Sequence, residues 1–88
     1  MEAVSRALHF YAPLSLMLAQ DLRDLGIRRV TDLAPRDPER LYTRLARLRG
    51  MRQDPCVLYA FRCAVYYART PRPRKELLKW WNWKDRAL

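Results

Sequence analysis

The chain has 88 residues, 50% of them hydrophobic and 31% charged, which is typical of one globular domain with a single core. Eighteen lysines and arginines stand against nine acidic residues, and the formal charge of +9 attracts polyanions such as nucleic acid or an acidic membrane face. No apolar run approaches the roughly 20 residues of a membrane span and no signal-peptide pattern begins the chain, so we expect a cytoplasmic protein that does not enter a membrane.

The first third of the chain predicts short helices. Residues 2–10 form a weakly patterned segment, which Ala12-Pro13 interrupts. A second helix is expected over about 14–25, because leucines recur there at helical spacing. These leucines are Leu14, Leu18, Leu22 and Leu25.

A tight turn should follow this helix. Gly26 is expected to end it, because glycine takes the left-handed conformation cheaply, and Ile27 can then fold back onto Leu22. Thr31 is expected to cap a single helical turn over 31–34.

The next two helices begin with the same signal, an aspartate followed by a proline. Asp37 can accept backbone N–H bonds while Pro38 fits the first helical position, and this helix should run to about residue 49 and stop at Gly50. Asp54-Pro55 repeats the start, and the helix over about 55–69 is apolar nearly all round, which predicts a central buried helix. The buried stripe expected on the earlier helix consists of Leu41, Leu45 and Leu48.

The C-terminal segment holds all three tryptophans. The prolines in the run 70–73 force an extended link, and a last helix is expected over about 74–84. That helix would bring Leu77, Trp80 and Trp81 together against the helix over 55–69, and would leave Trp83 as the exposed ring. No alternating pattern predicts a strand, so the fold class is all-α, a compact bundle of about five short helices.

Catalytic and metal sites are not indicated. Cys56 and Cys63 are seven residues apart, about 10.5 Å along a helix, which exceeds the roughly 7 Å limit for a disulfide. Their apolar neighbours should raise the thiol pKa rather than activate it. His9 is the single histidine, so three possible ligands fall short of a structural zinc site. We expect no enzyme, no catalytic residue, no metal and no cofactor.

Four sequence segments resemble the pathogenicity-locus family of small bacterial helix-hairpin-helix proteins, also labelled mitomycin-resistance-like. They are LRDLGIRRVTDL, DPERLY, DPCVLYAFRCAVYYA and KWWNWKD, and the resemblance covers roughly residues 10–85. It implies a single helical domain over 1–88, with a helix-hairpin-helix part at about 1–34 and a family signature segment at about 50–85.

The resemblance also implies a phosphate-binding hairpin, because such hairpins hold the nucleic-acid backbone through N–H groups at a glycine-x-glycine turn and the following helix start. The turn should fall near residues 12–15, where Pro13 and Ser15 stand in place of the glycines. Proline has no N–H and serine tolerates positive φ poorly, which leaves Ser15 and the N–H groups of Leu16 and Met17 as the possible phosphate contacts.

Basic residues form two further candidate contacts with a polyanion. Arg40, Arg44 and Arg47 form a helical stripe with only Glu39 nearby to offset their mutual repulsion. Arg36 extends this stripe, and Arg49 and Arg52 are additional candidates. A solvated face is the alternative interpretation. The second cluster lies at the proline link and consists of Arg69, Arg72, Arg74 and Lys75.

Arg62 lies in a very apolar segment and must find partners. We expect it to stack on tyrosines of its own helix and to pair with a carboxylate such as Asp85 or Asp54. The alternative is that it holds a ligand phosphate. For the tryptophans, base stacking is the alternative to a place in the core.

These observations predict a non-enzymatic module that binds DNA or RNA through the backbone with little sequence readout, with a role in repair or recombination as the resemblance suggests. The alternative is a protein-interaction adaptor whose basic face docks an acidic partner. No small-molecule substrate is evident. The candidate nucleic-acid-binding residues are Arg36, Arg40, Arg44, Arg47, Arg72, Arg74, Lys75 and Ser15.

Overall fold

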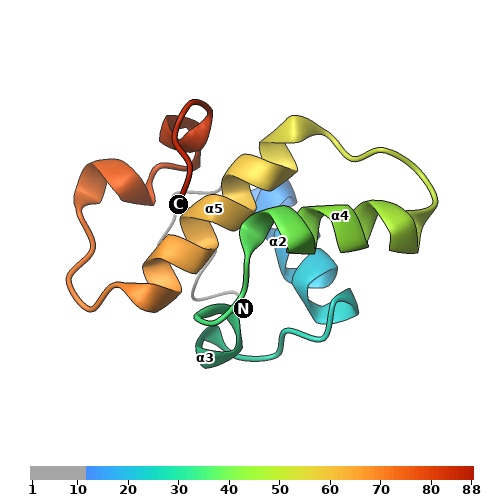
Figure 1. Ribbon diagram of the computed structural model, residues 1–88, viewed down its shortest axis with the longest axis horizontal. Coiled ribbons are helices and arrows are strands. Elements are labelled where there is room, and N and C mark those ends of the chain that lie inside the picture. The colour runs from blue at the N-terminus through green and yellow to red at the C-terminus, as the bar shows by residue number, and fades with distance from the viewer. Residues whose placement is uncertain (1–11) are drawn as a thin grey trace.

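The computed structural model describes residues 12–88, and this part of the chain is largely helical and contains no strand. Helix α5 crosses the middle of the molecule, with α4 on one side and the C-terminal 3₁₀ turns η1 and η2 on the other (Figure 1). No helix within 12–88 is both long and apolar enough to cross a membrane. The elements are α2 (Ala12–Asp24), α3 (Val30–Leu33), α4 (Pro38–Arg49), α5 (Pro55–Arg69), η1 (Lys75–Leu78) and η2 (Trp80–Trp83).

Helix α5 is the centre of the core, as its composition predicts. It packs against α3, α4, η1 and η2. Phe61, Ala64 and Val65 on α5 are completely buried, and so is Cys63. These side chains join one hydrophobic cluster that extends from Leu18 on α2 to Trp83 on η2.

Glycines end two of the helices as predicted. Gly26 and Gly50 adopt φ values of +86° and +69°, the left-handed region that a side chain disfavours. After α2, the N–H of Ile27 donates to the carbonyl of Leu22 at 2.8 Å, which folds the chain back as expected. After α4, the N–H of Met51 donates to the carbonyl of Ala46 at 3.1 Å in the same manner.

The aspartate–proline starts are also confirmed. Asp37 accepts a hydrogen bond from the N–H of Glu39 at 3.0 Å, and Asp54 accepts one from the N–H of Cys56 at 2.9 Å. Each aspartate satisfies a backbone donor that the first turn leaves open. The hydrogen bond from Cys56 lowers the pKa of Asp54.

Two local predictions in the first third are wrong. Helix α2 begins at Ala12, so residues 12–15 belong to its first turn rather than to a hairpin, because a proline is tolerated where helical N–H groups have no partner. The turn α3 begins at Val30, and Arg29, not Thr31, is its N-cap residue. The carboxylate of Asp32 accepts the N–H groups of Arg28 and Arg29, each at 3.1 Å, which sets this earlier start. The segment expected over 2–10 lies outside the described residues.

The buried stripe of α4 is shorter than predicted. Leu41 and Leu45 are buried, whereas Leu48 is 55% exposed. The last turn of α4 extends past the core, and Leu48 lines an open depression there with Leu25 and Asp24. Helical spacing predicts which face a leucine occupies but not how far the opposing surface extends.

The last predicted helix is instead two 3₁₀ turns. Lys79, between η1 and η2, is extended with φ −92° and ψ 112°, and this break changes which side chains face the core. Trp83 is therefore 2% exposed and Trp81 is 49% exposed, the reverse of the expected order. The indole N–H of Trp83 donates to the carbonyl of Leu77 at 2.9 Å, so the buried ring has its polar partner.

Candidate nucleic-acid interface

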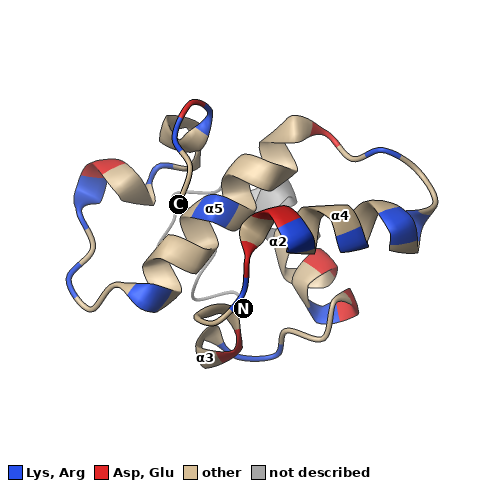
Figure 2. Ribbon diagram, in the orientation of Figure 1, with Lys and Arg blue, Asp and Glu red and all other residues tan. Residues whose placement is uncertain are grey.

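A row of arginines occupies the outer side of α4. Arg40, Arg44 and Arg47 are exposed, and their side chains make no hydrogen bond or ion pair with any residue in the described range 12–88. Basic residues recur along α4 in Figure 2. The stripe predicted from the spacing is therefore present and lacks internal partners within this range.

Shallow depressions join Arg36 to this row. One is lined by Pro35, Arg36 and Asp37 together with Arg40 and Arg44. Arg44 and Arg47 also line two neighbouring depressions, one of which reaches the end of α2. We call Arg36, Arg40, Arg44 and Arg47 the α4 arginine face.

Glu39, an acidic residue beside this face, is paired with Arg62. Nε of Arg62 lies 2.9 Å from Oε1 of Glu39, and its Nη1 donates to the carbonyl of Trp83 at 3.0 Å. The guanidinium also lies over the ring of Tyr59, 5.9 Å from the centroid. The structural interpretation of Arg62 thus holds, although its carboxylate is Glu39 and neither Asp85 nor Asp54.

The reason for this different partner is packing. Asp54 caps α5, and α4 lies alongside α5, which brings Glu39 within reach of Arg62 although the two residues are 23 positions apart in the sequence. Glu39 is the only acidic residue of α4, and its charge is offset by Arg62. Asp37, which caps α4, lies beside Arg36 and Arg40 and offsets part of the charge of the α4 arginine face.

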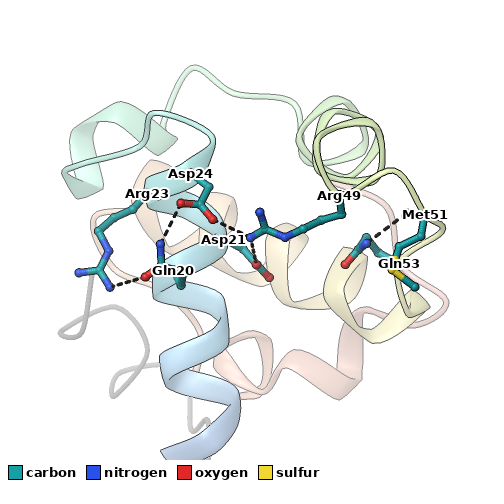
Figure 3. Close-up of polar contacts among 7 residues, drawn as sticks. All are labelled: Gln20, Asp21, Arg23, Asp24, Arg49, Met51 and Gln53. Carbon is teal, nitrogen blue, oxygen red and sulfur yellow. Dashed lines mark hydrogen bonds and ion pairs between the residues drawn. The ribbon is translucent and has the colours of Figure 1, made fainter.

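Arg49 does not extend this face. Its Nη2 lies 2.9 Å from Oδ1 of Asp21 and 2.7 Å from Oδ2 of Asp24, and it thereby links α4 to α2 (Figure 3). The hydrogen bond from Arg49 is the main cause of a lowered pKa at Asp24, to which Gln20 also donates at 2.8 Å. Arg49 therefore has a structural role.

Arg69 is likewise occupied inside the protein. Its Nε donates to the carbonyl of Ala34 at 2.6 Å and its Nη2 to the carbonyl of Arg36 at 2.7 Å. These bonds join the end of α5 to the loop before α4. They hold the backbone at Arg36 and remove Arg69 from the predicted second cluster.

The rest of the second cluster surrounds the link between α5 and η1. Arg72, Arg74 and Lys75 are exposed, and basic residues of this link appear on the opposite side of the view from α4 (Figure 2). Arg74 lies 3.8 Å from Glu76, and both side chains are largely exposed. The two basic clusters are separate, so they can be tested independently.

Ser15 belongs to the first turn of α2, and its side chain lies outside the part of the structure that is described. The structure thus brings four of the predicted residues onto one face, whereas the three others that it describes are exposed at the link before η1 and at its start. The pairing of Arg62 with Glu39 and the exposure of Trp81 were not predicted from the sequence, because no periodic pattern indicates either one.

Both cysteines are free thiols. Burial raises the pKa of Cys63 to about 12 and that of Cys56 to about 11, as the apolar surroundings predict. Both thiols are therefore protonated at neutral pH. Within 12–88, no group of three or more histidine, cysteine or acidic residues could hold a metal ion.

A family model described as "pathogenicity locus" matches residues 15–87, from the first turn of α2 to the end of the C-terminal segment. No curated protein and no solved structure matches the chain.

Proposed function

The chain belongs to the pathogenicity-locus family, and we propose that it is a non-enzymatic module that binds the backbone of DNA without reading its sequence. The observation that carries this proposal is the α4 arginine face, whose stripe residues have no internal partner within 12–88. Successive arginines on this helix are about 4.5–6 Å apart along its axis, so like charges face one another at close range. Phosphates would relieve that repulsion, and guanidinium groups bind them in bidentate fashion.

The helix-hairpin-helix type is part of the same proposal. Residues 12–15 are helical, so a phosphate contact at this end of α2 would come from backbone N–H groups and not from a hairpin over these residues. Ser15 and the N–H groups of the first turn of α2 are the contacts that this part of the proposal adds. A role in repair or recombination rests on the resemblance to helix-hairpin-helix proteins.

One observation favours an adaptor as a second candidate. Leu48 is exposed and lines the same depression as Arg44 and Arg47. Met51, just after α4, is 66% exposed. Arginines beside apolar side chains are typical of protein interfaces, so an acidic protein could dock on this end of α4.

Fluorescence anisotropy with a labelled DNA duplex tests the proposal. Contacts with about four phosphates predict that log K falls with log[salt] at a slope of roughly −3 to −4. Absence of binding at low salt would leave the adaptor as the better candidate. Tight binding that does not change between about 50 and 200 mM salt would contradict an electrostatic mechanism.

Two matched variants locate the contact. Arg40→Gln/Arg44→Gln/Arg47→Gln should weaken duplex binding at least about tenfold, or about 1.4 kcal/mol, with the fold intact. The matched variant removes three positive charges from the other cluster instead and should weaken duplex binding much less. It carries Arg72→Gln, Arg74→Gln and Lys75→Gln. Equal losses would show that net charge alone attracts the DNA, and a larger loss in the second variant would move the site to the proline link.

A further inference from the structure

Trp81 is an exposed aromatic ring with no place in the core. It is 49% exposed, whereas Trp83 two residues later is 2% exposed. Trp80 meets it edge-to-face, with ring centroids 5.8 Å apart and an interplanar angle of 86°. Such a contact orients the Trp81 ring and covers at most one of its two faces.

The surroundings of Trp81 are basic. Lys79 and Lys84 flank η2, and Arg86 follows; all three side chains are exposed and have no hydrogen bond or ion pair with the residues described over 12–88. Asp85 is the single acidic residue after η1. An exposed aromatic ring among unpaired cations is the combination with which proteins hold single-stranded nucleic acid, the cations contacting phosphates and the ring a base.

This segment also adjoins the α4 arginine face. Arg62 contacts both Glu39 at the start of α4 and the backbone of Trp83, so a single guanidinium spans the two elements. Leu88 lines a depression together with Pro38 and Glu39, which places the C-terminal end beside the same turn of α4. A strand bound along α4 could therefore continue onto η2.

We propose that Trp81 is a stacking platform for an unpaired base, and that the protein consequently prefers single-stranded nucleic acid to duplex DNA. The inference rests on the proposed function and specifies that the preferred nucleic acid is single-stranded. In a duplex, neighbouring bases cover both faces of each base, so Trp81 has nothing to stack on. In a single strand a base is free to do so whatever its identity, which agrees with binding that does not read sequence.

The test uses three labelled ligands of equal length: a mixed-sequence single strand, its duplex, and an abasic strand that keeps only sugar and phosphate. Trp81→Ala should weaken binding to the mixed single strand about tenfold and leave the duplex and abasic affinities within about twofold. Trp81→Phe should retain most of the affinity. The parent protein should bind the abasic strand about as weakly as the alanine variant binds the mixed strand.

The controls separate stacking from folding and from general apolar contact. Trp81→Leu keeps apolar bulk without an aromatic face, so it should bind the three ligands as the alanine variant does. If Trp81→Ala unfolds at a lower temperature than the parent, the leucine variant is the one that tests stacking. Leu48→Ala removes another exposed apolar side chain and should leave single-strand preference unchanged. Tryptophan emission should be quenched by the mixed strand in the parent and much less in Trp81→Leu.

The outcomes distinguish the two proposals. If the parent binds none of the three ligands, the proposed function itself fails. If the parent binds all three equally and the Trp81 variants match it, DNA-backbone binding stands and the stacking platform is wrong. An equal loss of affinity for all three ligands in a folded Trp81 variant would also overturn the platform. It would show that Trp81 supports the phosphate-binding surface and does not stack on a base.

Discussion

Trp81 and Trp83 are separated by one residue, yet their environments are opposite. Trp83 is buried beside Tyr66, with ring centroids 5.3 Å apart, and its N–H bonds to the carbonyl of Leu77. The side-chain amide of Asn82 donates to the carbonyl of Glu76 at 2.7 Å, so the WWNW motif supplies partners for two carbonyls of η1. The motif thus fixes the two 3₁₀ turns of the C-terminal segment against α5.

The two tryptophans should therefore differ in their effect on stability. Trp83→Ala removes a buried aromatic ring and should lower the free energy of unfolding by about 3–5 kcal/mol, close to the whole stability of a small domain. Trp81→Ala should cost less than about 1 kcal/mol, as surface substitutions usually do. Urea denaturation measures both, and a larger loss for Trp81→Ala would contradict the burial assigned to these rings.

Glu39 offers a second residue-scale test, because stability and DNA binding should change in opposite directions. Glu39→Gln leaves the half-buried Arg62 without its carboxylate and should cost about 1 kcal/mol of stability. The lost negative charge beside the α4 arginine face should strengthen duplex binding about twofold to threefold. Thermal melting and anisotropy measure the two effects.

The matched control is Glu76→Gln. It removes the same charge from an exposed carboxylate whose partner Arg74 lies at 3.8 Å, so stability should hardly change. If both variants strengthen duplex binding equally, the effect comes from net charge and does not locate the site near Glu39.

At the scale of elements, hydrogen bonds from arginine side chains connect neighbouring helices and add to the packing of the hydrophobic core. Arg49 joins α4 to α2, Arg62 joins α5 to both α4 and η2, and Arg69 joins α5 to the loop before α4. The remaining arginines of α4 are exposed without internal partners in the described range. Some arginines of this protein therefore join structural elements, and others are exposed. Which of the two an arginine does depends on whether a neighbouring element offers it a partner.

The ion pair between Arg49 of α4 and Asp24 of α2 should affect how Asp24 titrates in acidic solution. Because the pKa of Asp24 is lowered in the folded state, Asp24 binds fewer protons there than in the unfolded chain. Its contribution to stability is thus present above the unfolded pKa and is lost as the pH falls through the folded pKa. In Arg49→Gln, the pKa of Asp24 should rise toward 3.8, with the bond from Gln20 retaining part of the shift. Carboxyl NMR titration measures this, and Asp54 should titrate unchanged as the internal reference.

At the scale of the whole molecule, one core includes residues from α2 to η2. Leu77 and Trp83 belong to that cluster although they lie in short 3₁₀ turns, which have little stability of their own. The C-terminal segment is consequently part of the domain and not an appendage.

Deleting residues 73–88 should therefore leave an aggregating fragment, because one side of α5 loses its cover. Size-exclusion chromatography and circular dichroism on heating would measure this. Removing residues 87–88 alone, which are exposed, is the control and should preserve a cooperative melt. A monomeric 1–72 fragment that also melts cooperatively would show that α2 to α5 form a self-sufficient core.

The sequence by itself determined what depends on neighbouring residues along the chain. Gly26 and Gly50 end helices because of their φ angles, Asp37 and Asp54 begin them because of their hydrogen bonds, and α5 is central because it is apolar all round. The α4 arginine stripe was predictable for the same reason, since helical spacing alone places its members on one face.

Only the tertiary structure decided what depends on contacts between distant segments. Leu48 is exposed because the core ends before the last turn of α4. Arg62 pairs with Glu39 because α4 packs on α5. The break at Lys79 buries Trp83 and exposes Trp81, the reverse of the predicted order. Each outcome follows from the position and shape of a surface contributed by another element. Local periodicity assigns a side chain to a face, whereas burial and pairing depend on what lies opposite that face.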